Sequence, residues 1–574
     1  MYLLMEKNSR LFTRRLSTDA EYEVRFSDEW READAAWMYP NRFGYFTMSS
    51  SAESQPIPTT SGMAGHAASG TGWTAAQGVL NKVATMVATF IVAKYLSPDD
   101  FAMSALALGL GGFLVLLPPT VMSDVLITYE RQFKTVTPIC RQISTIAAVA
   151  AVITILLAIP VFVGWYSKFP GGTLTALLMV YAIRPVGESL STIPLSELRQ
   201  GLRYKSVAII DGGIQLCATL LTVVMAITGA GALALVMPQA VVPIAKAILY
   251  RTSASRYRTK DDPTTKSTRA HHQMWRKRLT AQFLTASSAQ YVHTLIGNAP
   301  ILVLGLISTQ LNTGFYTFSF YLAVQVVVVI SYQLSMVLQP IFVKLATDPV
   351  RQASAYLRVL RAVAAVAVPV SLLQAALAEP IFKLFFDAKW VGAIPVFAFL
   401  SIGQAFYFAI APTMGLLRAK RHFRKLLVWQ LGQLAASILL YALAAYVTDA
   451  AGVAAVDTAI WAISAVVGGA LALQGTGNRW TALVRPFMTP WIASLPIACA
   501  TWLIWLALRP LGTSGAVIAV GICGPIAGLL SLFATKFTQP LLYKEFVPIL
   551  NRGLYLLVNL RSAALSVVFR FNRD

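Results

Sequence analysis

Long apolar runs that recur along the chain are the feature that most restricts its fold. Stretches of about 20 mainly apolar residues follow one another between residues 72 and 535. Each is long enough, as a helix rising ~1.5 Å per residue, to cross a hydrocarbon layer of ~30 Å. The strands of a membrane barrel would instead alternate polar and apolar residues over segments of ~10. The chain is therefore predicted to be an all-α polytopic membrane protein.

The composition agrees with this class. Only 13% of the 574 residues are charged and 56% are hydrophobic, whereas a soluble domain carries roughly 25% charged residues. The formal net charge of +22 could suggest a nucleic-acid partner. The basic residues, however, lie in short connections between the apolar runs, where they anchor cytoplasmic loops. No nucleic-acid partner is predicted.

We predict 14 membrane spans, and the distribution of basic residues supports this count. The spans cover residues 72–95, 102–127, 143–164, 173–194, 207–228, 231–250, 282–306, 314–340, 356–378, 391–415, 426–447, 452–473, 487–508 and 514–535. Lys and Arg concentrate in every second connection, and the remaining connections carry few. Because short cytoplasmic loops are enriched in Lys and Arg, both termini are predicted to be cytoplasmic.

A basic, hydrophilic segment at 251–281 divides the spans. It separates a predicted N-terminal six-helix bundle (71–250) from a C-terminal six-helix bundle (282–480). Such halves can face each other across a central cavity in alternating-access carriers. Spans 13 and 14, at 481–535, follow as an addition.

The two ends of the chain are more polar. Residues 1–70 are mixed in charge and then rich in Ser, Thr and Gly, so they are predicted to be a disordered cytoplasmic extension. Met48 is an alternative start to Met1. Residues 536–574 place basic residues at near-heptad spacing among bulky apolar ones, which predicts an amphipathic helix on the cytoplasmic face.

Two charges stand inside the fourth span, in "MVYAIRPVGESL". A charge at the bilayer centre costs at least ~2.5 kcal/mol, so it usually faces a cavity or a partner. Arg184 and Glu188 are four residues apart and share one helix face. They either form an ion pair that steadies the helix or line a cavity. Pro185 and Pro194 predict a kink in this span.

Further polar positions inside the spans repeat at helical spacing. One such stripe in a span usually makes hydrogen bonds between helices. Several stripes spread over both bundles favour a hydrated central cavity with a cationic character. The candidate lining residues are Arg184, Lys82, Gln77, Asn81, His293, Gln325 and Tyr332. Lys246 adds to this cationic character or, because it lies near a span end, extends its side chain to the interface, which is the favoured expectation.

Three acidic residues lie well within the spans: Glu188, Asp211 and Asp457. Intramembrane carboxylates often bind the proton or sodium ion that drives a transporter, so these are candidates for ion coupling. The alternative is simple charge pairing, of Glu188 with Arg184 and of Asp211 with a cation that the sequence does not identify.

Signatures of catalysis are missing from the sequence. There is no nucleotide-binding glycine loop, and the four cysteines lack metal-ligand spacing, so no catalytic residue, cofactor or metal is predicted. Asp99 and Asp100 resemble the acidic pair of a membrane glycosyltransferase. Pro98 and Phe101 around them favour a turn between two spans, with Asp100 capping the second helix.

Several segments resemble bacterial polysaccharide transporters, the lipid-linked oligosaccharide flippases of the multidrug/oligosaccharidyl-lipid/polysaccharide exporter superfamily. These are "FIVAKYLSPDDFAMSALAL", "IPLSELRQGLRYKSVAIIDG", "ITGAGALALVMPQAV", "GFYTFSFYLA", "LQPIFVKLATDPVR" and "FFDAKWVGAIPVFAFLS". The resemblance covers about residues 72–430. Two positions depart from the pattern: Ala102 replaces a usual glycine, and "NAP" at 298–300 lacks an acidic residue often found there.

The resemblance implies two six-helix bundles in the bacterial cytoplasmic membrane that flip a polyprenyl-diphosphate-linked oligosaccharide. The cargo would serve O-antigen, capsule or exopolysaccharide synthesis, with a polymerase and glycosyltransferases as partners. Arg184 and Lys82 would hold the diphosphate, since buried cations can replace its lost hydration. The alternatives are a drug/cation antiporter of the same superfamily and a membrane glycosyltransferase or ligase.

Overall fold

The computed structural model describes residues 60–538, apart from 128, 130–132, 202, 256–268, 326–341, 343–344, 346–347, 421 and 477–479. Contacts divide the chain into two units, Met1–Met63 and Ala64–Asp574. Of the first unit, only Thr60–Met63 at the start of the first described helix belongs to the described residues. The extension at 1–59, the C-terminal tail beyond 538 and Tyr332 lie outside them.

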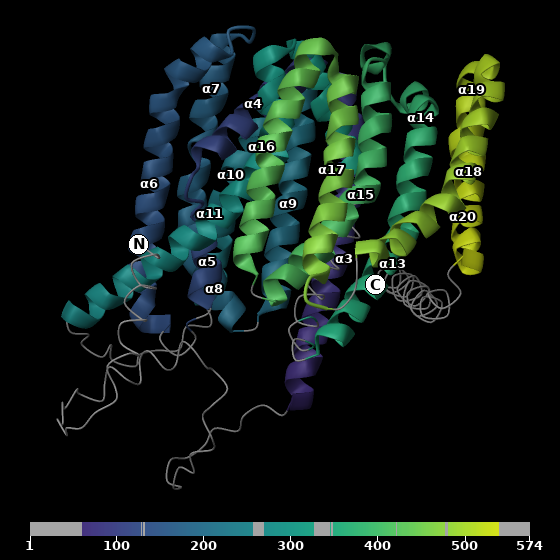
Figure 1. The fold of residues 1–574 in the computed structure, drawn as a ribbon. Helices are drawn as coiled ribbons and strands as arrows, with labels where there is room; N and C mark the ends of the chain where they lie inside the picture. The colour runs from purple at the N-terminus through teal and green to yellow at the C-terminus, as the bar shows by residue number, and fades with distance from the viewer. Residues whose placement is uncertain are drawn as a thin grey trace, which may run out of the picture. The chain divides into compact units, whose positions relative to one another are not determined.

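Every regular element in the described residues is a helix (Figure 1). The first half contains α3 (Thr60–Tyr95), α4 (Pro98–Leu114), α5 (Val121–Ile127), α6 (Phe133–Trp165), α7 (Gly171–Tyr181), α8 (Arg184–Gln200), α9 (Tyr204–Ile227) and α10 (Leu233–Ser255). The second half contains α11 (Arg269–Ile307), helical residues 310–325, α13 (Pro349–Ala376), α14 (Ala378–Phe385), η1 (Ala388–Trp390), α15 (Ala393–Ala419), α16 (Phe423–Val447) and α17 (Ala450–Leu473).

The remaining helices are η2 (Trp480–Leu483), α18 (Val484–Leu508), η3 (Arg509–Leu511), α19 (Gly512–Ile518), a π-helical turn η4 (Ala519–Cys523) and α20 (Gly524–Thr538). Among the described residues, nine helical runs are long and apolar enough to cross a membrane by length and composition. Most described residues of the predicted spans are helical, with residues 115–120 of the second span as the main exception. The all-α polytopic fold class is confirmed.

Each half has its own interior. In the first half α8 packs against α6 and α10, and α4 packs against α7 around a core that includes Leu106, Ile155 and Leu178. In the second half α15 packs against α13 and α17. The last spans attach to the second half because α18 and α20 lie against α13.

Two predicted spans are broken. The span predicted at 102–127 consists of α4 and α5, separated by a non-helical stretch that contains Pro118 and Pro119. This break was not predicted, but proline explains it because it lacks the backbone N–H that a helix needs. The predicted kink in the fourth span is present between α7 and α8, where Pro185 leaves the Tyr181 carbonyl without its usual donor.

Helix α11 begins at Arg269, earlier than the predicted start at 282. The extra turns are amphipathic: Trp275, Leu279 and Phe283 recur every four residues and are buried in a core with residues of α5 and α6. A helix with one apolar stripe can stay ordered despite a high overall charge. Much of the predicted linker at 251–281 is therefore helical, with 256–268 outside the described residues.

Besides the packing of α11 on the first half, the two halves also meet where α3 ends and α4 begins. Trp390 in η1 donates its indole N–H to the Ala93 carbonyl at 2.9 Å, and the Lys389 ammonium donates to the Lys94 carbonyl at 2.8 Å. Gly314 packs so closely on Pro98 that a Cβ there would stand 2.0 Å from the Pro98 oxygen. We call these contacts the α3–η1 seam. It closes the halves against each other at this end.

Candidate functional site

Arg184 is the first residue of α8, about midway along the kinked α7–α8 pair. Its Nε lies 2.8 Å from Glu188 Oε1, and its guanidinium carbon lies 5.6 Å from the centre of the Tyr181 ring. The predicted pairing is therefore present. The ion pair uses only Nε, so both Nη groups make no hydrogen bond to any described residue. With 35% of its side chain exposed, against 13% for Glu188, the arginine can still bind an anion.

The break before Arg184 adds a second positive contribution. The N-terminus of a helix carries a partial positive charge from its unpaired N–H groups. Discontinuous membrane helices present such ends to anionic groups in transporters. Arg184 thus places a full positive charge at the positive end of α8.

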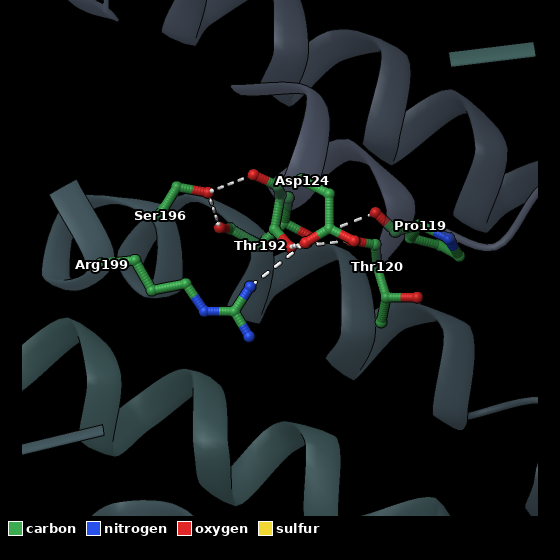
Figure 2. A network of polar contacts seen from close by, with 7 residues as sticks. Pro119, Thr120, Asp124, Thr192, Ser196 and Arg199 are labelled. Carbon is green, nitrogen blue, oxygen red and sulfur yellow. Dashed lines mark hydrogen bonds and ion pairs between the residues drawn. The ribbon is translucent and has the colours of Figure 1, made fainter. Parts of the chain in front are cut away.

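Side chains of α8 fix it to the broken second span (Figure 2). Thr192 donates to the Pro119 carbonyl at 3.3 Å, and Ser196 donates to the Ser123 carbonyl at 3.4 Å. Arg199 pairs with Asp124 at 3.2 Å near the end of the helix. Each hydroxyl also bonds to a carbonyl of its own helix, Thr192 to Glu188 at 2.9 Å and Ser196 to Thr192 at 2.8 Å, so the bonds to the second span are shared ones. Sequence reasoning missed this network, although Pro118-Pro119 and the spacing of Thr192 and Ser196 were visible signals.

Asp211 is paired. Lys246 Nζ lies 2.7 Å from its Oδ1, and the Tyr250 hydroxyl donates to the same oxygen at 2.5 Å. Lys246, whose side chain was expected to extend to the membrane interface, is bound by the carboxylate on the neighbouring helix. The cation that the sequence left unidentified is Lys246.

The predicted residues of the first span lie near α9. Gln77 and Asn81 line a pocket of about 230 Å³ with Gly212 and Gly213 of α9. A Cβ on Gly212 would stand 2.7 Å from Gln77 Cγ, so glycine permits this close approach. Lys82, the next residue of α3, makes no ion pair with another described residue and remains a candidate.

Gln325 and His293 line two different pockets. Gln325 belongs to a mainly apolar pocket of about 290 Å³ with Met86 and Phe90 of α3 and Val520 of η4. His293 lines a smaller pocket inside the second half. Among the predicted site residues that the structure describes, only Arg184 with Glu188, and Gln77 with Asn81, lie together, and the others are in different places.

Asp457 is buried, with 2% of its surface exposed. The Tyr316 hydroxyl donates to its Oδ2 at 3.0 Å, and the Tyr441 hydroxyl donates to its Oδ1. The two tyrosines come from helical residues 310–325 and from α16. Sequence reasoning did not predict these partners, because they reach Asp457 only through the packing of other helices against α17.

The acidic pair at the start of α4 has a structural use. Ser97 and Asp100 form a capping box, with Asp100 Oδ2 accepting from the Ser97 N–H at 2.9 Å. The predicted capping role of Asp100 is confirmed.

In the part of the chain that the structure describes, no three His, Cys, Asp or Glu residues gather as a metal site.

Comparisons with known proteins identify a family and similar folds for this chain. The family model described as "Polysaccharide biosynthesis protein" matches residues 91–395. No curated protein matches by sequence. Two similar solved structures are "Lipid II flippase MurJ, inward closed conformation" (TM-score 0.60, 12% identity, 83% of this chain and 99% of that chain covered) and "Inward-facing conformation of a multidrug resistance MATE family transporter of the MOP superfamily" (TM-score 0.52, 12% identity, 69% and 96% covered).

At this identity the two structures establish a shared fold. The family model covers more than half of the chain. This protein therefore belongs to the polysaccharide biosynthesis protein family and has the membrane fold found in MurJ and in MATE transporters of the MOP superfamily.

Proposed function

We propose that the protein is a flippase for a polyprenyl-diphosphate-linked oligosaccharide in surface polysaccharide synthesis. It acts without catalysis in the bacterial cytoplasmic membrane, with both termini in the cytoplasm. The bundles at 71–250 and 282–480 alternate access to the substrate. The family description and the fold shared with a lipid II flippase support this proposal.

The environment of Arg184 carries the proposal. A diphosphate bears about two negative charges and cannot cross hydrocarbon without compensation. Arg184 offers both Nη groups, is partly exposed, and is the first residue of α8. A guanidinium fork can bind two phosphate oxygens at once. Glu188 holds the arginine through Nε and leaves that fork free.

The lipid part of such a substrate needs an apolar path. The pocket beside Gln325 is lined mainly by apolar side chains from α3, α13 and the η4–α20 region. Its volume of about 290 Å³ fits a few isoprene units. Val520, Gly524 and Pro525 of span 14 form part of its wall, which gives this span a use in a lipid flippase.

The antiporter alternative also has an observation in its favour. The fold is shared with a multidrug resistance transporter, and Asp457 with its two tyrosines is an acidic, aromatic cluster. That cluster is buried and already hydrogen-bonded, whereas Arg184 has unused donors. A glycosyltransferase is disfavoured because Asp100 serves as part of a helix cap.

Reconstitution tests the proposal. Purified protein in liposomes is supplied with a fluorescent polyprenyl-diphosphate sugar, and the fraction accessible to a reagent outside the vesicle is followed with time. We expect protein-dependent transfer between leaflets without any change in the covalent structure of the lipid. Drug efflux without transfer of the lipid, or a new covalent product, would contradict the proposal.

A further inference from the structure

A small pocket inside the second half has a polar and aromatic lining. It lies between α11, helical residues 310–325, α15 and α17. Its volume is about 90 Å³, and its lining includes His293, Gly297, Phe320, Gln404, Tyr407 and Trp461. Among the described residues, none that lines it is acidic, a lysine or an arginine. It is therefore suited to a neutral, polar ligand.

Gln404 indicates that the pocket receives such a ligand. Its side chain is buried, with 2% of the residue exposed, and its Oε1 makes no hydrogen bond in the part of the chain that the structure describes. A buried acceptor left without a donor is unfavourable, and most are satisfied in folded proteins. A ligand hydroxyl entering the pocket would supply the missing donor.

Two rings give the pocket an ordered apolar wall. Tyr407 and Trp461 pack edge to face, with centroids 4.7 Å apart and planes at 89°. Trp461 follows Asp457 by one helical turn, and Asp457 is fixed by Tyr316 and Tyr441. The wall is therefore held by a hydrogen-bonded cluster directly behind it.

We propose that this pocket is a subsite for one sugar unit of the transported lipid, an inference that rests on the proposed function. A pyranose presents hydroxyl donors around its rim and an apolar C–H face, which matches Gln404 on one side and aromatic rings on the other. A water needs ~10–15 Å³ by the same measure of volume. The pocket of about 90 Å³ therefore holds several waters or one monosaccharide, and it excludes a longer saccharide.

Equilibrium binding to the full-length protein in lipid nanodiscs tests the subsite. The probes are polyprenyl diphosphate alone and polyprenyl diphosphate carrying one glucose, galactose or N-acetylglucosamine. We expect at least one glycosylated lipid to bind about tenfold more tightly than the bare lipid, as one or two good hydrogen bonds allow. Gln404→Leu should remove this preference and leave the affinity for the bare lipid unchanged.

A second variant fills the pocket without disturbing its walls. A Cβ on Gly297 would meet no heavy atom within 4 Å, so Gly297→Leu extends into open space. It should abolish the sugar-dependent gain while the protein keeps its thermal stability. Gln433→Leu is the matched control: Gln433 is also buried with an unpaired amide nitrogen, but it does not line this pocket.

The outcomes separate the two proposals. If no sugar improves binding, or if Gln404→Leu and Gly297→Leu both retain the gain, the subsite is overturned and the flippase proposal stands. If the wild-type protein binds none of the four lipids, the proposed function is overturned together with the subsite.

Discussion

At the scale of single residues, what Arg184 can bind depends on its charge and on which of its nitrogens already donate a hydrogen bond. Glu188 lies four residues further along α8 and contacts Nε alone. A carboxylate that met both Nη groups would have blocked the fork. The observed geometry orients the guanidinium and leaves two donor groups for a ligand.

Substitution of Arg184 separates binding from helix support. Arg184→Lys keeps the charge but loses the fork, so transport of the lipid-linked sugar should fall in part. Arg184→Ala should abolish transport while expression persists, and Arg184→Ala with Glu188→Ala should restore folding without transport. The readout is lipid transfer in liposomes. Normal transport by the double variant would show that the pair only stabilises the helix.

Arg199 provides the control for these variants. It pairs with Asp124, whose side chain is 76% exposed. Exposed ion pairs contribute about 0–1 kcal/mol. Arg199→Ala should therefore leave transport close to that of the wild-type protein.

Asp457 makes a prediction of a different kind. Asp457→Leu would leave the Tyr316 and Tyr441 hydroxyls without their acceptor, at about 1–3 kcal/mol for each buried group. The melting temperature in detergent should fall clearly, and Tyr316→Phe in the same chain should recover part of the loss.

If Asp457 also couples transport to an ion, Asp457→Asn should make transport indifferent to proton and sodium gradients. Wild-type transport that ignores both gradients would remove the coupling role.

How much of the site the sequence predicts depends on sequence separation. The Arg184–Glu188 pair follows from helical spacing alone and was predicted. Lys246 is a near neighbour of Asp211 only because α9 and α10 pack together, and the tyrosines around Asp457 come from two other helices. Such partners depend on tertiary packing, which a single sequence does not reveal.

At the scale of elements, the broken spans are the main departure from regular helices. Continuous apolar sequence predicts a helix long enough to cross the membrane, and nine helical runs among the described residues meet that criterion. It says nothing about whether the helix is continuous, so the break at Pro118-Pro119 was missed. Helix α14 and η1 were also missed because eight and three residues are too few to show a clear period.

The network between α5 and α8 should stabilise the broken span measurably. Thr192→Val keeps the shape of the side chain and removes the hydroxyl, which bonds both to the Pro119 carbonyl and to the Glu188 carbonyl of its own helix. We expect a loss of about 1 kcal/mol, seen as a lower melting temperature. The exposed Thr154 hydroxyl bonds only within its own helix, so Thr154→Val is the control and should change little. If Thr192→Val and Thr154→Val lowered the melting temperature equally, the network would not stabilise the broken span.

At the scale of the whole molecule, the α3–η1 seam joins the two halves through Gly314, Lys389 and Trp390. An alternating-access carrier must open and close such a contact in each cycle. The seam therefore belongs to one of the two states that the proposed function requires.

A larger residue at Gly314 should prevent closure. Gly314→Leu would collide with the Pro98 carbonyl, so the halves should remain apart at this end and transport should fall. Ala93, which is 1% exposed, reports the state when it is changed to Cys in a cysteine-free background. A water-soluble thiol reagent should label Cys at this position faster in the Gly314→Leu protein. Gly213→Leu, where a Cβ meets nothing within 4 Å, should label at the wild-type rate.

The acceptors of the α3–η1 seam are main-chain carbonyl groups of Ala93 and Lys94. Every amino acid supplies the same carbonyl, so mutations at these two positions need no compensating mutation in η1. During evolution the end of α3 can drift in sequence while the junction persists. Searches for correlated substitutions between the two halves should therefore overlook this junction, even though it joins them.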